Sequence, residues 1–361
     1  MMRMKLARII PAKSSLFLLT AATIAASFAL VKKQPELAYG NPRDQERGRL
    51  ARVPEDIPKR GLLDVLGRVF NEVRNDRVTL IAGGVTFYIL LALFPALAVL
   101  VSLYGLFADP ATMSEHLGKL AVILPPGAFD LVADQLTALT AQKSETLGIA
   151  FIVGLAVTLW SSHNGILAIF DAMNVAYNEN EKRSLIHLNV VAMGFTICAM
   201  IAVAVVIGFV AIVPVLFSYL YLDAYLETAV LITRWPLLLL GAALAAMAIY
   251  RFAPSREPAK IRWLTWGAAL TTISWFVMSL GYSFYMENFA NYAKTYGTLG
   301  ALIGFLIWVW LSVTILIVGG TLNAELEHQT ALDTTTGPEL PMGTRGAYVA
   351  DTLGEESKLS V

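Results

Sequence analysis

Long apolar blocks alternate with short polar segments along most of this 361-residue chain. Six blocks occupy about residues 79–107, 147–176, 188–219, 229–251, 264–286 and 298–325. Each exceeds the ~20 residues that an α-helix needs to cross the hydrocarbon core of a bilayer. Because lipid cannot hydrogen-bond to the peptide groups, each block predicts a transmembrane helix.

Two further elements precede these blocks. Residues 15–31 are apolar and follow four basic residues, which is typical of a signal peptide and equally of a short transmembrane or interfacial helix. Residues 32–59 are polar and contain four prolines, which indicates a linker. We favour an additional N-terminal hydrophobic helix whose orientation the sequence leaves open.

Residues 61–77 combine apolar positions at near-helical spacing with Arg68, Arg74 and Arg77. This pattern predicts an amphipathic helix. It fits a helix lying on the membrane surface, and it fits a solvated helix packed on the rest of the protein, so both interpretations stay open.

Basic residues predict the orientation. The segment before the first block and the loops after the second and fourth blocks are rich in Lys and Arg, whereas the intervening loops are poor in them. Positive charge marks the cytoplasmic side, so both ends of the six-helix core and the C-terminus are expected in the cytoplasm. Lys182 and Arg183 then act as a cytoplasmic anchor after the second block.

The predicted fold class is therefore all-α: a polytopic membrane helix bundle with six core transmembrane helices plus the N-terminal hydrophobic helix. The expected domains are a hydrophobic segment with its linker (1–58), a membrane domain with an amphipathic entry helix (59–328) and a flexible cytoplasmic tail (329–361). The tail is rich in Thr, Gly, Pro and acidic residues and has no apolar core of its own.

Composition agrees with this class. Hydrophobic residues make up 57% of the chain and charged residues 15%, against about 25% charged in soluble domains. The net charge of +0 gives no footprint for nucleic acid. A single cysteine, Cys198, and four scattered histidines offer no metal-ligand spacing, and no nucleotide-binding loop is present. We expect no cofactor, no metal and no nucleic-acid partner.

The second block carries a group of polar residues inside its apolar sequence. They are Ser161, His163, Asn164, Asp171 and Asn174, and at 100° per residue they gather on one helix face. The stripe is either an interhelical hydrogen-bonded seam or a wet substrate path. Asp171 lies near the end of the block, where a carboxylate can reach the membrane interface.

The first and last blocks supply small and polar residues at a similar depth. The small and kink-forming positions are Gly83, Gly84, Pro95, Gly297, Gly300, Gly319 and Gly320. Pro95 lacks an amide hydrogen and is expected to kink its helix, and the glycines are expected at close helix contacts. The polar candidates are Tyr88, Asn323 and Glu325. Depth alone predicts that Gly84, Tyr88, Asp171, Asn174 and Asn323 converge.

Three stretches carry a family resemblance: "AGGVTFYILLALFPALAVLVSLYGL", "LWSSHNGILAIFDAMNVAYNENEKRS" and "YGTLGALIGFLIWVWLSVTILIVGGTLNAELE". Over about residues 60–330 the chain resembles the YihY/BrkB family of bacterial inner-membrane proteins. The resemblance implies a six-span helical core and no settled activity, since the family has carried ribonuclease, virulence and transport labels. Many relatives have Glu near the end of the last helix where this chain has Thr321, so a mechanism needing that carboxylate is in doubt unless Glu325 replaces it.

Three function classes follow. A transporter or lipid flippase, with membrane lipids as partners and a lipid or small solute as substrate, fits the polar stripe and the proline-containing helix best. A membrane scaffold for envelope biogenesis is the alternative. A ribonuclease needs carboxylates, histidines or lysines clustered in water, which the short cytoplasmic loops do not offer. Oligomeric state stays open.

Overall fold

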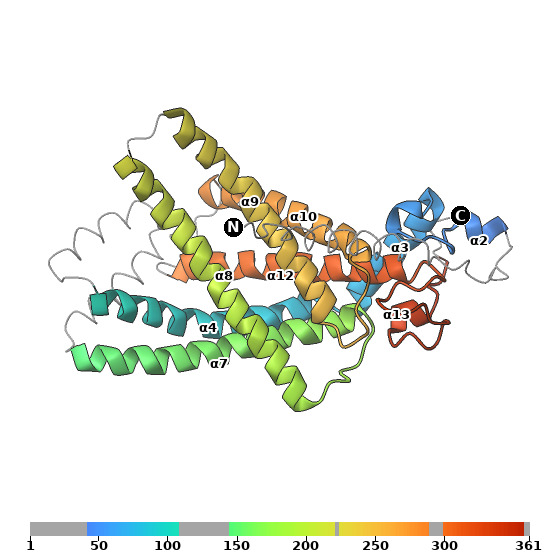
Figure 1. The fold of residues 1–361 in the computed structure, drawn as a ribbon, viewed down its shortest axis with the longest axis horizontal. Coiled ribbons are helices and arrows are strands. Elements are labelled where there is room, and N and C mark those ends of the chain that lie inside the picture. The colour runs from blue at the N-terminus through green and yellow to red at the C-terminus, as the bar shows by residue number, and fades with distance from the viewer. Residues whose placement is uncertain (1–41, 108–143, 221–223, 289–298, 357–361) are drawn as a thin grey trace, which may run out of the picture. The chain divides into compact units, whose positions relative to one another are not determined.

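The computed structural model describes residues 42–107, 144–220, 224–288 and 299–356, and within these ranges the protein is helical with no strand (Figure 1). One isolated β-bridge joins Ala259 to Thr335. The chain divides into two compact units, Met1–Gln45 and Glu46–Val361, and the long helices belong to the second.

Each apolar block forms one long helix within a few residues of its expected ends. These helices are α4 (Val78–Phe107), α7 (Ser144–Ala176), α8 (Leu185–Leu220), α9 (Ala224–Phe252), α10 (Ile261–Asn288) and α12 (Leu299–Glu327). The shorter elements are α2 (Pro42–Glu46), the 3-10 helix η1 (Pro54–Asp56), α3 (Lys59–Asn75) and α13 (Tyr348–Asp351). The predicted all-helical membrane fold is confirmed.

The number of spans is less sharply defined than the helices. Within the described residues, four stretches are long and apolar enough to cross a membrane, namely Ile152–Ala176, Leu185–Ala202, Ile261–Met286 and Leu302–Glu327. A fifth arises if α3 and Val78–Leu93 count as one span bent by 58°. The count of six therefore stays a prediction, and residues 15–31 lie outside the described residues.

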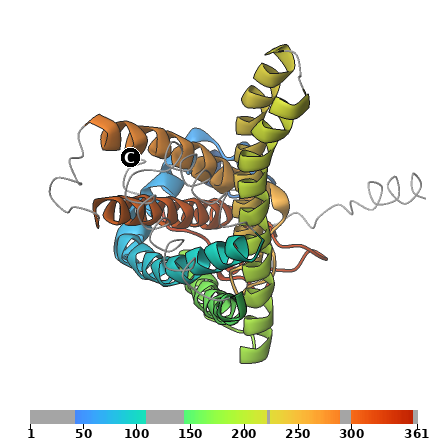
Figure 2. The same cartoon turned by 90° about the vertical axis from the view of Figure 1, so that its left-hand side faces the viewer.

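α12 lies at the centre of the bundle. It contacts α3, α4, α7 and α10, while α4 runs alongside α7 and α9 packs on α10. α8 contacts α7 and crosses it obliquely, so it stands apart from the α4–α7–α12 group when the molecule is turned (Figure 2).

Glycines allow the central helices to approach each other closely. A Cβ placed on Gly267 of α10 would collide with the backbone of Gly319, and one placed on Gly319 would collide with Tyr250 and Thr271. A Cβ on Gly320 would lie 3.1 Å from Met173 Sδ of α7. Gly300 is buried, and Gly297 lies outside the described residues.

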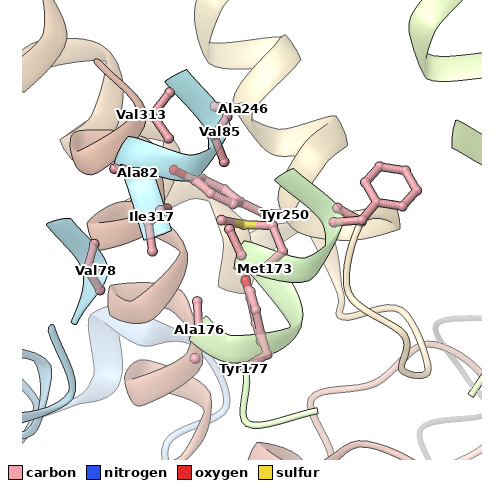
Figure 3. Packing of buried hydrophobic residues seen from close by; sticks show 14 of the residues in the cluster. Val78, Ala82, Val85, Met173, Ala176, Tyr177, Ala246, Tyr250, Val313 and Ile317 are labelled. Carbon is pink, nitrogen blue, oxygen red and sulfur yellow. The ribbon is translucent and has the colours of Figure 1, made fainter. Parts of the chain in front are cut away.

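Gly83 and Gly84 do not have the packing role that the sequence suggested. Both are exposed, and a Cβ built on either meets nothing within 4 Å. The physical reason is the rotation of α4, which turns Val78, Ala82 and Val85 toward the core and the glycines outward (Figure 3). Pro95 lies inside α4, which continues past it.

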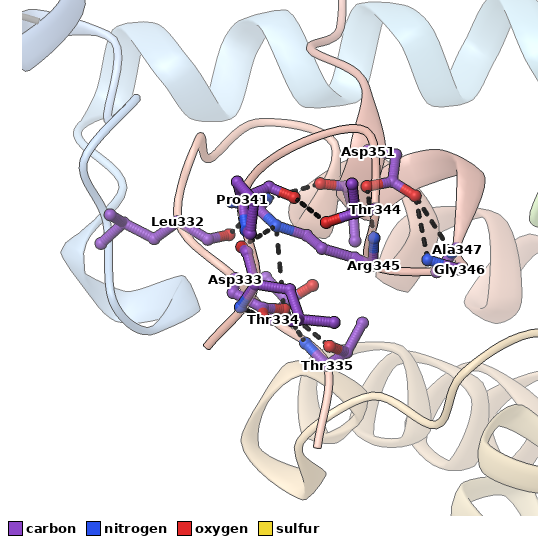
Figure 4. Close-up of polar contacts among 12 residues, drawn as sticks. Leu332, Asp333, Thr334, Thr335, Pro341, Thr344, Arg345, Gly346, Ala347 and Asp351 are labelled. Atoms are coloured by element: carbon purple, nitrogen blue, oxygen red, sulfur yellow. Dashed lines mark hydrogen bonds and ion pairs between the residues drawn. The ribbon is translucent and has the colours of Figure 1, made fainter. Parts of the chain in front are cut away.

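The segment after α12 differs from the flexible tail that its composition suggested, because residues 329–356 fold against the end of the bundle. Arg345 is buried and donates to the carbonyls of Leu332, Ala350 and Ala331, at 3.3, 2.6 and 2.9 Å (Figure 4). Hydrogen bonds to backbone carbonyls therefore hold this segment, together with Val349, which packs in the main buried cluster. These residues contact the end of α12, Arg68 of α3 and the connections after α7 and between α9 and α10, and this end of the bundle is called the capped end below.

Candidate functional site

The polar stripe of α7 is divided between the interior and the surface. Ser161, His163 and Asn174 are buried, Asn164 is half-buried and Asp171 is exposed. The stripe therefore does not line a single passage. His163 and Asn174 have different partners on different elements.

His163 pairs with α8. Its Nε2 lies 2.9 Å from Asn189 Oδ1, so the ring N–H donates to the amide oxygen, and Asn189 Nδ2 donates to the Leu185 carbonyl at 2.7 Å. His163 is 8% exposed and its Nδ1 is buried without a hydrogen-bond partner, whereas Asn189 is exposed. A polar pair thus joins the two helices and reaches the outer surface of α8.

A shallow depression lies beside this pair. It has a volume of about 410 Å³ and is lined by Leu185, Ile186, Asn189, Val190 and Met193 of α8. The lining is apolar except for Asn189. This arrangement places a hydrogen-bonding side chain next to a hollow that suits a hydrocarbon chain.

Asn174 connects the end of α7 to the loop between α9 and α10. Its Oδ1 accepts the backbone N–H of Ser255 at 2.7 Å, and its Nδ2 donates to Glu181 Oε2 at 3.1 Å. The Ser255 hydroxyl oxygen in turn accepts the N–H of Lys182 at 2.8 Å. The amide is therefore fully engaged in holding two connections together at the capped end.

Arg183 and Glu181 form a second part of this connection. Both contacts between the guanidinium and the carboxylate are 2.8 Å long, and Arg183 also donates to the Ala253 carbonyl at 2.7 Å. The hydrogen bonds from Arg183 outweigh the effect of burial and lower the pKa of Glu181 to about 2. Lys182 binds Glu179 at 2.7 Å. The two predicted anchor residues thus make internal ion pairs.

A fully buried ion pair fastens α12 to the same loop. Arg256 donates to Glu327 at 2.7 and 3.3 Å, and the Thr334 hydroxyl donates to Glu327 Oε2 at 2.7 Å. The Arg256 guanidinium also lies over the ring of Tyr177, 5.2 Å from the ring centre. Sequence analysis missed this pair because nothing in the chain shows that the loop folds back onto the end of α12.

Asn323 and Glu325 bind residues of the helices next to α12. Asn323 is completely buried and accepts the Gly267 N–H at 2.7 Å, which ties α12 to α10. Glu325 binds Arg68 of α3, and Arg68 also donates to Gln329 Oε1 at 2.7 Å. Thr321 is buried and donates to the Ile317 carbonyl at 3.1 Å. Glu325 therefore faces α3 and not the helix crossing around Thr321.

The convergence expected from depth does not occur. Asn174 and Asn323 are buried at the capped end, whereas Gly84, Tyr88 and Asp171 are exposed. The space between α4, α7, α9 and α12 contains Val85, Met173, Ile317 and Tyr250, whose hydroxyl donates to the Leu316 carbonyl at 2.8 Å (Figure 3). Apolar packing occupies the place where a polar passage was expected.

Metal chemistry finds little support in the described residues, where no group of three His, Cys, Asp or Glu side chains lies close enough to hold one ion. The expectations of no catalytic residue and no cofactor stay predictions.

The fold and the internal polar contacts define a multi-pass helical membrane protein. A family model described as "Virulence factor BrkB" matches residues 69–341, and the chain belongs to this family. The match includes α4 to α12 and the first part, residues 329–341, of the segment at the capped end.

Individual relatives agree with the family. A protein of Bacillus subtilis named "Putative ribonuclease-like protein YfkH" is 32% identical over 255 residues, covering 68% of this chain and 89% of that protein. The membrane protein Nmul_A0452 of Nitrosospira multiformis is 27% identical, covering 69% of this chain and 57% of its own length. The membrane protein NMB0524 of Neisseria meningitidis is 26% identical, with shares of 70% and 61%. The chain thus spans about three fifths of the last two relatives. No solved structure matches the chain.

Proposed function

We propose that this protein is a transporter or lipid flippase of the bacterial cytoplasmic membrane, which moves an amphiphilic molecule or a small solute. The observation that carries the proposal is the His163–Asn189 pair, which reaches the surface of α8 beside an apolar depression. Binding sites for amphiphiles combine apolar walls with a few placed polar groups.

The proposal places the substrate contact between α7 and α8. The route first expected between α4, α7 and α12 is filled by apolar side chains at the capped end. α8 contacts the bundle through α7 and leaves Val190, Ile197 and Ile201 exposed. A bilayer molecule has direct access to this face, whereas the central packing excludes it.

The His163–Asn189 pair is notable because His163 is buried in an apolar helix. A polar side chain at membrane depth is costly and normally meets protein or water. Asn189 satisfies its amide with His163 and the Leu185 carbonyl, and its exposed side chain keeps room for one more hydrogen bond. The head group of an amphiphile supplies such a partner.

A lipid-translocation assay tests the proposal. The full chain is reconstituted in liposomes containing a fluorescent phosphatidylethanolamine, and the loss of inner-leaflet fluorescence after an external quencher is followed. The wild-type protein is expected to exceed protein-free liposomes, and Asn189→Leu is expected to lose most of that activity. Met193→Leu, which keeps the depression apolar, is the matched control.

Two results count against the proposal. Wild-type activity in Asn189→Leu contradicts the site, and baseline translocation by folded wild-type protein contradicts a flippase role for this lipid class. Orientation is tested separately by tag accessibility, because the cytoplasmic C-terminus is inferred from basic loops.

A membrane scaffold is the second candidate. The observation in its favour is the ordered segment 329–356, which presents the exposed residues Pro338, Glu339, Leu340 and Pro341 on a base held by Asp333 and Arg345. Such a fixed loop suits protein contact. Recovery of one stoichiometric partner that is lost on Leu340→Asp would favour the scaffold.

A further inference from the structure

α3 has two neighbouring apolar faces, whose centres lie about 110° apart around the helix at 100° per residue. One face, with Val65 and Val69, packs in a buried cluster with Trp263, Leu322 and Leu326. The other face carries Leu63, Leu66 and Phe70, which are 46%, 56% and 69% exposed. At 100° per residue these three side chains fall within an arc of about 60°. α3 is thus bound to the bundle and still has an uncovered apolar stripe.

Basic residues stand at both ends of this stripe. Lys59 and Arg74 fall on the same helix face as Leu63 and Phe70, and both are exposed. Neither makes an ion pair with any residue that the structure describes. The carboxylates of α3, on Asp64 and Glu72, lie on the opposite half of the helix. The exposed face is therefore apolar in the middle and cationic at its ends.

The position of α3 next to α4 extends the apolar surface of the membrane helices. The two helices meet at a bend of 58°, where Arg77 adopts a left-handed conformation with φ of 52°. One turn later, Leu80 of α4 is 68% exposed, and Phe87 follows at 55%. A bend of this kind allows an amphipathic helix to lie along the bilayer surface.

We propose that the exposed face of α3 binds the surface of an anionic phospholipid bilayer. Leu63, Leu66 and Phe70 enter the boundary between head groups and acyl chains, and Lys59 and Arg74 hold anionic head groups. This pattern matches interfacial helices, which combine a hydrophobic face with basic residues and bind anionic lipids.

Charge argues against a second copy of the chain as the occupant. In a two-fold pairing of this stripe, the Lys59 end of one helix would meet the Arg74 end of its partner. Two cations would then oppose each other at each end, with no carboxylate on the contacting face. An anionic lipid surface complements the same charges.

Site-specific fluorescence on the full chain tests the proposal. In a Cys198→Ser background, Phe70→Cys carries a polarity-sensitive fluorophore, and the protein is placed in phosphatidylcholine nanodiscs. Each sample contains an equal fraction of spin-labelled phosphatidylglycerol or spin-labelled phosphatidylcholine, whose nitroxide quenches nearby fluorophores. A label at Leu340→Cys, which is exposed in residues 329–356, is the control outside the membrane.

The expected result is quenching at Phe70→Cys by both lipids, with a stronger effect from phosphatidylglycerol, and no quenching at Leu340→Cys. Arg74→Gln should reduce the preference for phosphatidylglycerol about fivefold, since one cation near the surface contributes ~1 kcal/mol. Asn71→Gln, an exposed neutral neighbour on α3, should leave the preference unchanged.

Three outcomes would overturn the proposal. The first is a water-exposed label at Phe70→Cys that neither lipid quenches. The second is a shielded, unquenched label that cross-links between chains, which identifies self-association. The third is equal quenching of the Phe70→Cys label by the two lipids in the protein that keeps Lys59 and Arg74, which would contradict a role of these basic residues in lipid binding.

Discussion

Asn174 Oδ1 accepts the backbone N–H of Ser255 at 2.7 Å, so the last turn of α7 holds the loop between α9 and α10. The same amide donates to Glu181. A residue expected either in a seam or on a substrate path therefore bonds two connections at the capped end. Because Asn174 and Ser255 are both buried, water does not replace the bond to Ser255 when the Asn174 side chain is removed.

Replacing Asn174 is expected to destabilise the protein. Asn174→Leu leaves the buried N–H of Ser255 without an acceptor, which costs about 1–3 kcal/mol. Asp171→Asn, an exposed change three residues earlier, should stay within about 0.5 kcal/mol. Denaturant unfolding in detergent measures both, and equal stability of the two variants would contradict the structural role of Asn174.

The buried pair of Arg256 and Glu327 predicts strong non-additivity. Glu327→Leu or Arg256→Met alone leaves one buried charge unpaired and should cost about 3–5 kcal/mol. The double variant Arg256→Met, Glu327→Leu should cost less than the sum of the single changes, because it leaves no buried charge. A double-mutant cycle of unfolding free energies checks this, and simple additivity would show that the residues act independently.

Stability is expected to fall in acid through Glu181. Its pKa is lowered from 4.5 to about 2 in the folded protein, so its contribution is present above pH 4.5 and is lost as the pH falls toward 2. Arg183→Gln removes the main cause of the shift. Melting temperatures of this variant and the wild type should therefore converge below pH 4.5, and a constant difference across the range would exclude the linkage.

Gly319, at a crossing of α12, and Gly83, on the exposed face of α4, should respond in opposite ways to substitution by alanine. Gly319→Ala places a methyl group against Tyr250 and Thr271, and such overpacking costs about 1–3 kcal/mol. Gly83→Ala fills open space on a helix and should stabilise by up to about 1 kcal/mol. Thermal unfolding of the two variants is the measurement, and a destabilised Gly83→Ala would mean that this surface is covered.

Some of this architecture follows from the sequence alone. Hydrophobic length fixed the six long helices to within a few residues, because lipid forces a long apolar segment to bond its own peptide groups. The amphipathic spacing of residues 61–77 likewise predicted α3. The sequence left two interpretations open for α3: one face packs on the bundle, as one of them expected, and contact of the neighbouring exposed face with the membrane stays a proposal.

Tertiary structure decided which polar residues meet. Helix rotation turned Gly84, Tyr88 and Asp171 outward while Asn174 and Asn323 became buried, and depth along the chain contains no information on rotation. The segment 329–356 lacks an apolar pattern, so composition suggested a flexible tail. Its order comes from Arg345 and other side chains bonded to backbone carbonyls, and such bonds depend on where the chain folds back.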